Sequence, residues 1–213
     1  MDQSLTHTFS PHRQHKRDLM TARILDTARE IMRAEGVAAL SMQELARRLD
    51  LRAPSLYNYF SSKTDLYDAL VRLGFSLYGK QIAELTAPAT QGASCWQDEL
   101  RLNIEAYMSF ALDNPDLYQL CFERPVPGFV PSAQSLQLSF NILHQSYQRA
   151  AGLLPMMDTD LNPQQFVDLI IAIMHGLTAL HLANQPDLPV GEGRFGSLIP
   201  AVMSVLDKAW SKS

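Results

Sequence analysis

Polar and basic side chains that could bind nucleic acid are concentrated between residues 41 and 63. Arginine can pair with two acceptors on guanine, and glutamine or asparagine can pair with adenine, so Arg52, Gln43 and Asn58 are candidates for reading bases. Hydroxyl groups, ammonium groups and helix N-termini more often contact phosphates. The candidate DNA-contacting residues are Ser41, Gln43, Arg52, Ala53, Ser55, Tyr57, Asn58, Tyr59 and Lys63.

Predicted helices would hold these side chains in place. The first covers about residues 17–35, where apolar residues recur at helical spacing, and Gly36 supplies a left-handed stop. A second helix begins at Ser41, which has the capping-box spacing to Glu44.

A third predicted helix, over about residues 54–60, follows a short turn at Asp50, a residue type that tolerates the left-handed conformation. Pro54 fits the first turn of this helix. Two helices joined by a turn of this length form a helix-turn-helix, whose second helix enters the major groove of DNA.

The rest of the sequence also has helical rather than strand periodicity, so we predict an all-α fold. An N-terminal three-helix DNA-binding domain would be joined by one helix to a larger C-terminal helical domain. We expect a flexible tail over 1–16, the helix-turn-helix domain over 17–62, a connecting helix over 63–86 and the C-terminal domain over 87–213, with further helices at about 95–113, 116–123, 132–151, 163–184 and 197–211.

Charge is distributed unevenly along the 213 residues. Residues 1–63 contain ten Lys and Arg against seven Asp and Glu, whereas the remainder contains eight against fifteen. A basic N-terminal part favours a polyanionic partner. The cysteines lack metal or redox spacing, the N-terminus lacks an apolar signal segment, and the longest apolar runs are too short to span a membrane. We therefore expect a cytoplasmic protein with no membrane contact, metal or cofactor.

Residues 17–70 resemble the N-terminal domain of TetR-family transcriptional regulators. The matching elements agree in order and spacing and are Ile24-Leu25, Ala28, Gly36, Leu40-Ser41, Leu45-Ala46, Leu56-Tyr57-Asn58-Tyr59-Phe60 and Lys63-Thr64-Asp65-Leu66. The resemblance implies a homodimer whose N-terminal domains bind double-stranded operator DNA and whose C-terminal domains bind a small molecule that releases the DNA. Two residues depart from the family pattern: Asp50 stands where glycine is common, and Arg52 replaces a small hydroxyl residue that would cap the third helix.

The C-terminal half is similar to a subgroup of these regulators named for a Trp-His-Gly signature. The similarity rests on residues 114–122 and on the step from residue 174 to 176, where methionine replaces the tryptophan. An effector pocket is then expected between the helices near 95–113, 132–151 and 163–184. Its walls would be apolar and without counter-ions, so we predict a largely apolar, uncharged effector. The expected lining is Ile104, Tyr107, Met108, Phe140, His144, Tyr147, Met174 and His175.

The predicted helices at 163–184 and 197–211 are apolar on more than one face, so part of their surface should meet a second copy of the chain. Two helices from each subunit would form a four-helix interface, in which small residues permit close approach. A thick monomeric core is the alternative. The expected interface residues are Ala172, Gly176, Ala179, Ala183, Val202 and Leu206.

Other functional classes fit the sequence less well. A helical module that binds or transports a small molecule without contacting DNA is the main alternative, and binding to duplex DNA at low salt would separate the two. No Ser/His/Asp or Cys/His set stands in a motif for nucleophilic catalysis, so we do not expect an enzyme. Tyr57 and Tyr59 could be packing aromatics, and His144 and His175 could be ordinary core or interface histidines.

Overall fold

The computed structural model describes residues 11–86 and 95–212, and within these ranges the regular structure is helical, apart from one isolated antiparallel bridge between Met157 and Ser211. This confirms the predicted all-α fold. The elements are α1 (Pro11–Glu35), η1 (Val37–Ala39), α2 (Met42–Arg48), α3 (Ala53–Leu56), α4 (Lys63–Thr86), α5 (Trp96–Asp113), α6 (Pro115–Tyr118), η3 (Gln119–Glu123), α7 (Ala133–Leu153), η4 (Leu154–Met156), α8 (Pro163–Asn184), α9 (Gly193–Gly196) and α10 (Ile199–Trp210).

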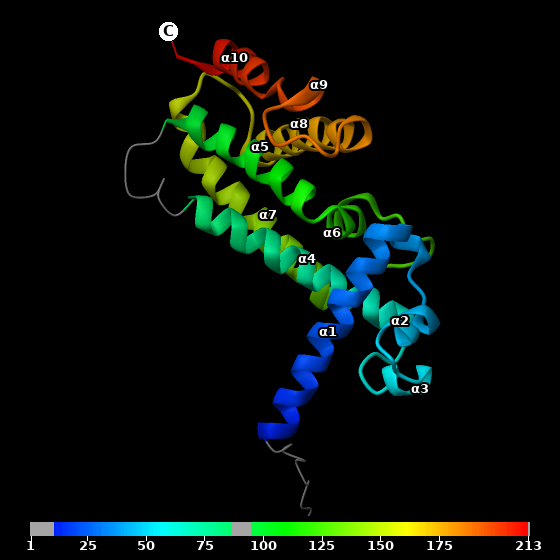
Figure 1. The fold of residues 1–213 in the computed structure, drawn as a ribbon. Coiled ribbons are helices and arrows are strands. Elements are labelled where there is room, and N and C mark those ends of the chain that lie inside the picture. The colour runs from blue at the N-terminus through cyan, green and yellow to red at the C-terminus, as the bar shows by residue number, and fades with distance from the viewer. Residues whose placement is uncertain (1–10, 87–94, 213) are drawn as a thin grey trace, which may run out of the picture.

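Figure 1 shows three regions along the molecule. The head consists of α1, α2 and α3 and lies at one end, α4, α5 and α7 run through the middle, and α8, α9 and α10 lie at the opposite end. Ile24 and Ile31 of α1, Leu45 of α2 and Leu56 of α3 are fully buried, because they meet in the core of the head. The long helix α4 extends from this head into the body.

Several helix boundaries differ from those predicted. The first helix begins at Pro11 rather than near residue 17, so residues 11–16 are helical and not part of a flexible tail. Residues 1–10 and the proposed 87–94 boundary lie outside the described residues. The third helix ends at Leu56, because the following residues form a turn in which the Phe60 N–H donates to the Leu56 carbonyl at 3.0 Å. Helix α7 continues past Gly152.

The local signals at the helix ends are confirmed in part. Asp50 has a φ of 54°, as the left-handed turn after α2 requires. Ser41 caps α2 by accepting from the Glu44 N–H, but the Glu44 carboxylate turns to Arg47 and Arg48 rather than back to the cap. The predicted capping box is therefore only half formed.

Helix α8 has the length and composition of a membrane-spanning helix, the one such helix among the described residues. The unbroken apolar runs of the sequence understate this helix, because single polar residues interrupt it. Core helices of globular proteins meet the same criterion, and α8 packs against α5, α7 and α9. Only 33% of its most apolar window is buried, which leaves an apolar face without a partner in the protomer.

A buried ion pair connects the head to the body. The side chain of Asp116, on α6, is fully buried and accepts from the Nε atoms of Arg29 at 2.8 Å and of Arg33 at 2.9 Å, both on α1. The second terminal nitrogen of Arg29 also donates to the Asn114 amide oxygen at 2.8 Å. A buried carboxylate needs such partners because desolvation of an unpaired charge is expensive. These contacts fix α1 against α6.

We predict that Asp116→Asn destabilises the protein by about 3 kcal/mol, because Arg29 and Arg33 lose the carboxylate that compensates their charge. Urea unfolding followed by circular dichroism measures this change. The matched control is Asp98→Asn, which removes an exposed ion pair with Arg101 and should have a much smaller effect. Equal midpoints for Asp116→Asn and the unsubstituted protein would show that the pair does not stabilise the fold.

Candidate functional site

The exposed edge of the helix-turn-helix carries most of the predicted DNA-contacting residues. Leu45 and Leu56 are buried and hold α2 against α3, so the opposite surface stays open. Gln43, Arg52, Tyr57 and Asn58 are exposed there, and Ser41, Ala53 and Ser55 are partly exposed. Arg52 precedes α3 in an extended conformation without a side-chain cap, as its residue type predicts. Its guanidinium therefore forms no hydrogen bond with the first turn of α3.

Two of the predicted residues are also engaged within the protein. Tyr59 is half-buried, and the Arg17 guanidinium lies 5.6 Å from its ring centroid. The ammonium of Lys63, at the first residue of α4, lies 5.3 Å from the ring centroid of Tyr67. This position of Tyr59 agrees with the alternative that it is a packing aromatic residue. Lys63 remains partly exposed at a helix N-terminus, where backbone N–H groups favour an anion.

Arg17 belongs to this surface although the sequence analysis did not select it. It donates to the Asn58 carbonyl at 3.0 Å and covers Tyr59, so the extended α1 contacts the turn after α3. The contact joins residues about forty positions apart, so it depends on how α1 packs against that turn and no local sequence pattern predicts it.

The arginines of α2 are neutralised by acidic neighbours. Arg47 and Arg48 both bond to Glu44, and Arg48 also pairs with Glu35. The hydrogen bonds from Arg47 and Arg48 lower the pKa of Glu44 to about 2. The carboxylate therefore stays charged at neutral pH, and Arg52 is left as a cation without a partner among the described residues.

A cavity of about 280 Å³ lies in the body. It is bounded by α4, α5, α7, α8 and η3, and most of its wall is apolar. Its lining is Phe75, Tyr78, Ile82, Glu99, Leu100, Asn103, Tyr107, Phe122, Ser139, Ile142, Leu143, Ser146, Arg149, Ala150, Leu153, Phe166, Val167, Ile170, Ile171 and Met174.

The predicted lining agrees with this cavity at Tyr107 and Met174. The other predicted residues lie elsewhere. Ile104 and Met108 are buried in the core, and Phe140 is 56% exposed. His144 forms a hydrogen bond with Gln148, and the Tyr147 hydroxyl lies 3.5 Å from the Asp168 carboxylate. His175 lies behind the wall, where it forms hydrogen bonds with two tyrosines. The α7 residues were misassigned because the face of that helix that meets α4 is set by tertiary packing.

Helix α4 contributes to the cavity wall, although the sequence predicted it only as a connecting helix. Phe75 and Tyr78 of this helix line the cavity and pack edge-to-face against Phe122 at centroid distances of 5.6 Å. The expected absence of charge is also wrong. Arg149 and Glu99 stand on the wall, with a closest N–O distance of 3.8 Å.

His175 links the cavity wall to α6. Its Nδ1 lies 3.1 Å from the Tyr107 hydroxyl and 3.0 Å from the Tyr118 hydroxyl. Burial raises the pKa of Tyr107, and burial with the nearby Glu123 charge raises the pKa of Tyr118 to about 12, so both phenols are neutral at physiological pH. Tyr118 ends α6, two residues after the buried Asp116. Hydrogen bonds thus extend from the cavity wall to the helix that holds the head.

A helix-turn-helix joined to a cavity-bearing helical body defines a DNA-binding regulator of the one-component type. Residues 24–70 match the sequence profile described as bacterial regulatory proteins of the tetR family, and residues 100–195 match the tetracyclin repressor-like C-terminal domain. The chain belongs to the TetR family of transcriptional regulators.

Individual relatives agree with this assignment. An HTH-type transcriptional regulator of Saccharopolyspora erythraea is 32% identical over 122 residues, which are 56% of this chain and 48% of the relative. The chain therefore spans about half the length of the curated relatives it matches. The crystal structure of putative regulatory protein SCO4313 is 25% identical, with a TM-score of 0.70 over 92% of this chain and 98% of that one.

A third comparison supports the fold alone. The structure of FadR from Bacillus subtilis, solved with stearoyl-CoA, is 17% identical, with a TM-score of 0.62 over 88% of this chain and 97% of that one. Together the matches favour a regulator over a small-molecule module without a DNA function. None of them tests the Trp-His-Gly subgroup, which stays a prediction.

We predict that Ala150→Phe blocks the cavity, because Ala150 lines it and is only 2% exposed. Binding of the apolar dye N-phenyl-1-naphthylamine, measured by fluorescence, should weaken at least about tenfold. The control is Ala151→Phe, which adds the same ring at the next, exposed position of α7. Unchanged dye affinity in Ala150→Phe, with the fold intact, would place the dye outside this cavity.

Proposed function

We propose that this chain is a cytoplasmic, homodimeric repressor, released from operator DNA when a small, largely apolar molecule occupies the 280 Å³ cavity. The observation that carries the proposal is the physical connection between the cavity and the head. Tyr107 lines the cavity, His175 joins it to Tyr118, and Asp116 on the same short helix holds α1. A ligand that displaces Tyr107 would therefore act on the position of the helix-turn-helix.

The proposed direction of the response follows from geometry. In a dimer, the two recognition helices must be spaced by about one turn of DNA, roughly 34 Å, to enter successive major grooves. A small shift of α6 that carries α1 with it moves each α3 away from that spacing. Ligand binding then reduces DNA affinity to the extent that it favours the shifted state.

Within the DNA interface, we assign base recognition to Arg52, Gln43 and Asn58. All three are exposed, and Arg52 has no partner among the described residues. We assign phosphate contacts to Ser41, Ser55, Tyr57 and Lys63, with a smaller contribution from Tyr59, whose ring already packs under Arg17.

Two substitutions should separate these roles. Arg52→Ala should cost about 1 to 3 kcal/mol on the operator and less on unrelated DNA, because a base contact carries the sequence preference. Lys63→Ala should weaken both DNAs alike and reduce the salt dependence, because a phosphate contact releases counterions. Fluorescence anisotropy with an operator selected from genomic fragments, measured over a salt series, gives both quantities.

Lys80→Ala is the control for this experiment, since Lys80 is an exposed lysine farther along α4 that pairs with Glu84. If Arg52→Ala kept the full operator preference, base recognition would belong to other residues of the motif. If neither Arg52→Ala nor Lys63→Ala changed DNA binding, the assignment of this surface would be wrong.

We place the dimer interface on the outer faces of α8 and α10. Leu169 and Leu180 on α8 are 41% and 46% exposed, and Val205 on α10 is 66% exposed, so both helices present apolar residues that lack a cover in the protomer. The small residues Ala172, Gly176 and Ala183 are exposed on the same face of α8, Ala179 is partly exposed there, and Val202 is partly exposed on α10. Exposed apolar surfaces of this extent are typical of protein interfaces.

One predicted interface residue does not lie on this surface. Leu206 is only 6% exposed, because α10 turns Ile199, Met203, Leu206 and Trp210 toward the core of its own protomer. Val205, which the interface prediction omitted, takes its place on the outer face.

We predict that Gly176→Glu yields monomers, because a carboxylate at the centre of this surface would be buried without a counter-ion. A side chain at Gly176 meets nothing within 4 Å in the protomer, so the protomer itself tolerates the change. Sedimentation velocity measures the outcome, and Gly152→Glu, at a helical glycine of α7 that is equally open, is the control. A dimeric Gly176→Glu protein would place the interface elsewhere.

A further inference from the structure

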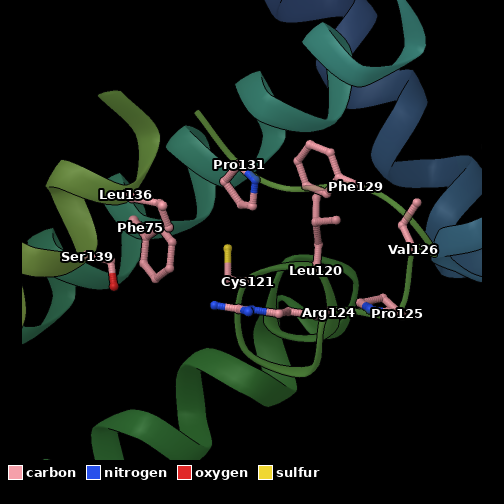
Figure 2. A pocket seen from close by; sticks show the side chains of 10 residues that line it. All are labelled: Phe75, Leu120, Cys121, Arg124, Pro125, Val126, Phe129, Pro131, Leu136 and Ser139. Carbon is pink, nitrogen blue, oxygen red and sulfur yellow. The ribbon is translucent and has the colours of Figure 1, made fainter. Parts of the chain in front are cut away.

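A second, smaller cavity of about 70 Å³ lies between η3, the chain from residue 124 to 131, α4 and α7. Figure 2 shows Phe75 and Leu136 on one side, Phe129 and Val126 on the other, and Arg124 extending beneath the Cys121 thiol toward Phe75. Burial raises the pKa of Cys121 to about 12, so the thiol is neutral and brings no charge. The guanidinium of Arg124 is the charged group on this wall.

Arg124 differs from the arginines that stabilise the fold. Arg29, Arg33, Arg72 and Arg149 each have a carboxylate partner, whereas Arg124 is an exposed residue with neither an ion pair nor a hydrogen bond within residues 11–86 and 95–212. Its backbone adopts the left-handed conformation, with φ of 51°, where the π-helical turn η3 ends. This uncommon conformation directs the chain around the cavity.

The smaller cavity adjoins the larger one. Phe75 and Ser139 line both, so one wall separates an unpaired guanidinium from the apolar space of about 280 Å³. The charges in the larger cavity already compensate each other, because Arg149 faces Glu99. Arg124 is therefore the cation of the smaller cavity, and the larger cavity beyond Phe75 and Ser139 is mostly apolar.

We propose that the effector is an amphipathic carboxylic acid, whose carboxylate binds Arg124 and whose apolar chain passes Phe75 into the larger cavity. This deepens the proposed function and rests on it for the regulatory consequence. A carboxylate matches the planar fork of a guanidinium in two parallel hydrogen bonds, which a hydroxyl or an ester cannot form. The head group is small, as the volume beside Arg124 requires. An uncharged effector would leave this arginine unused.

The position of Arg124 also suits regulation. It directly follows η3, which continues α6, so a bound carboxylate would act on the segment that carries Asp116. Phe129 from the same cavity wall packs against Tyr67 at 5.4 Å, and Tyr67 donates to the Val37 carbonyl of the head at 2.8 Å. Two sets of contacts thus connect the carboxylate site to the head, one through η3 and α6 and the other through Phe129 and Tyr67.

The test compares octanoate, decanoate and dodecanoate with the alcohols of the same chain lengths, by calorimetry on the full chain at neutral pH without DNA. At least one acid should bind more tightly than its alcohol. Arg124→Gln should weaken that acid by about tenfold or more and leave the alcohol nearly unchanged, because the substitution removes charge-assisted hydrogen bonds and little apolar surface. Arg101→Gln, which removes an exposed arginine of α5 outside both cavities, is the control.

Three results would overturn the proposal. One is that no acid binds more tightly than its alcohol. Another is that Arg124→Gln keeps the full preference for the acid. The third is that Arg149→Gln removes the preference while Arg124→Gln does not, which would place the carboxylate at the opposite end. Operator binding by the ligand-free protein is measured separately, so loss of DNA binding would contradict the proposed function without affecting the assignment of the carboxylate site.

Discussion

The carboxylate of Asp116 is the constraint on which the arrangement of the molecule depends. It is fully buried at the junction of head and body, and a buried charge is tolerated only when its partners are fixed in place. Those partners, Arg29 and Arg33, lie one turn apart on α1. The pair therefore fixes both the distance and the rotation of α1 against α6, whereas apolar packing alone would permit sliding. Any signal between the two parts has to move these groups together.

His175 lies between the cavity wall and α6. Its Nδ1 atom lies within hydrogen-bond distance of the Tyr107 and Tyr118 hydroxyls. Tyr107 is on the cavity wall and Tyr118 on α6. In the proposed function, a ligand that displaces the Tyr107 hydroxyl would change the hydrogen bonds of His175, which also contacts Tyr118 on α6.

Sequence reasoning succeeded where the determining forces are local and failed where they are tertiary. Asp50 and the start of α8 at Pro163 follow from turn and capping preferences within a few residues. Cavity walls depend on which way a helix faces, and successive residues differ by about 100° around its axis. Phe140 was therefore predicted to line the cavity although it is 56% exposed, whereas Ile142 lines it. Leu206 was predicted on the outer face although it is 6% exposed, whereas Val205 is 66% exposed. The Asp116 pair joins residues more than eighty positions apart, which no local pattern shows.

Part of the basic charge of the head is already compensated within the protein. Acidic neighbours already compensate Arg47 and Arg48, and the Asp116 carboxylate compensates Arg29 and Arg33. Fewer cations than the ten Lys and Arg of residues 1–63 are therefore free to contact phosphates, and each phosphate contact contributes to affinity through the counterions it releases. A single head would bind weakly at physiological salt, whereas a dimer doubles the contacts on one DNA molecule and fixes their spacing. If the apolar outer faces of α8 and α10 form the proposed dimer interface, operator binding depends on them as well as on α3.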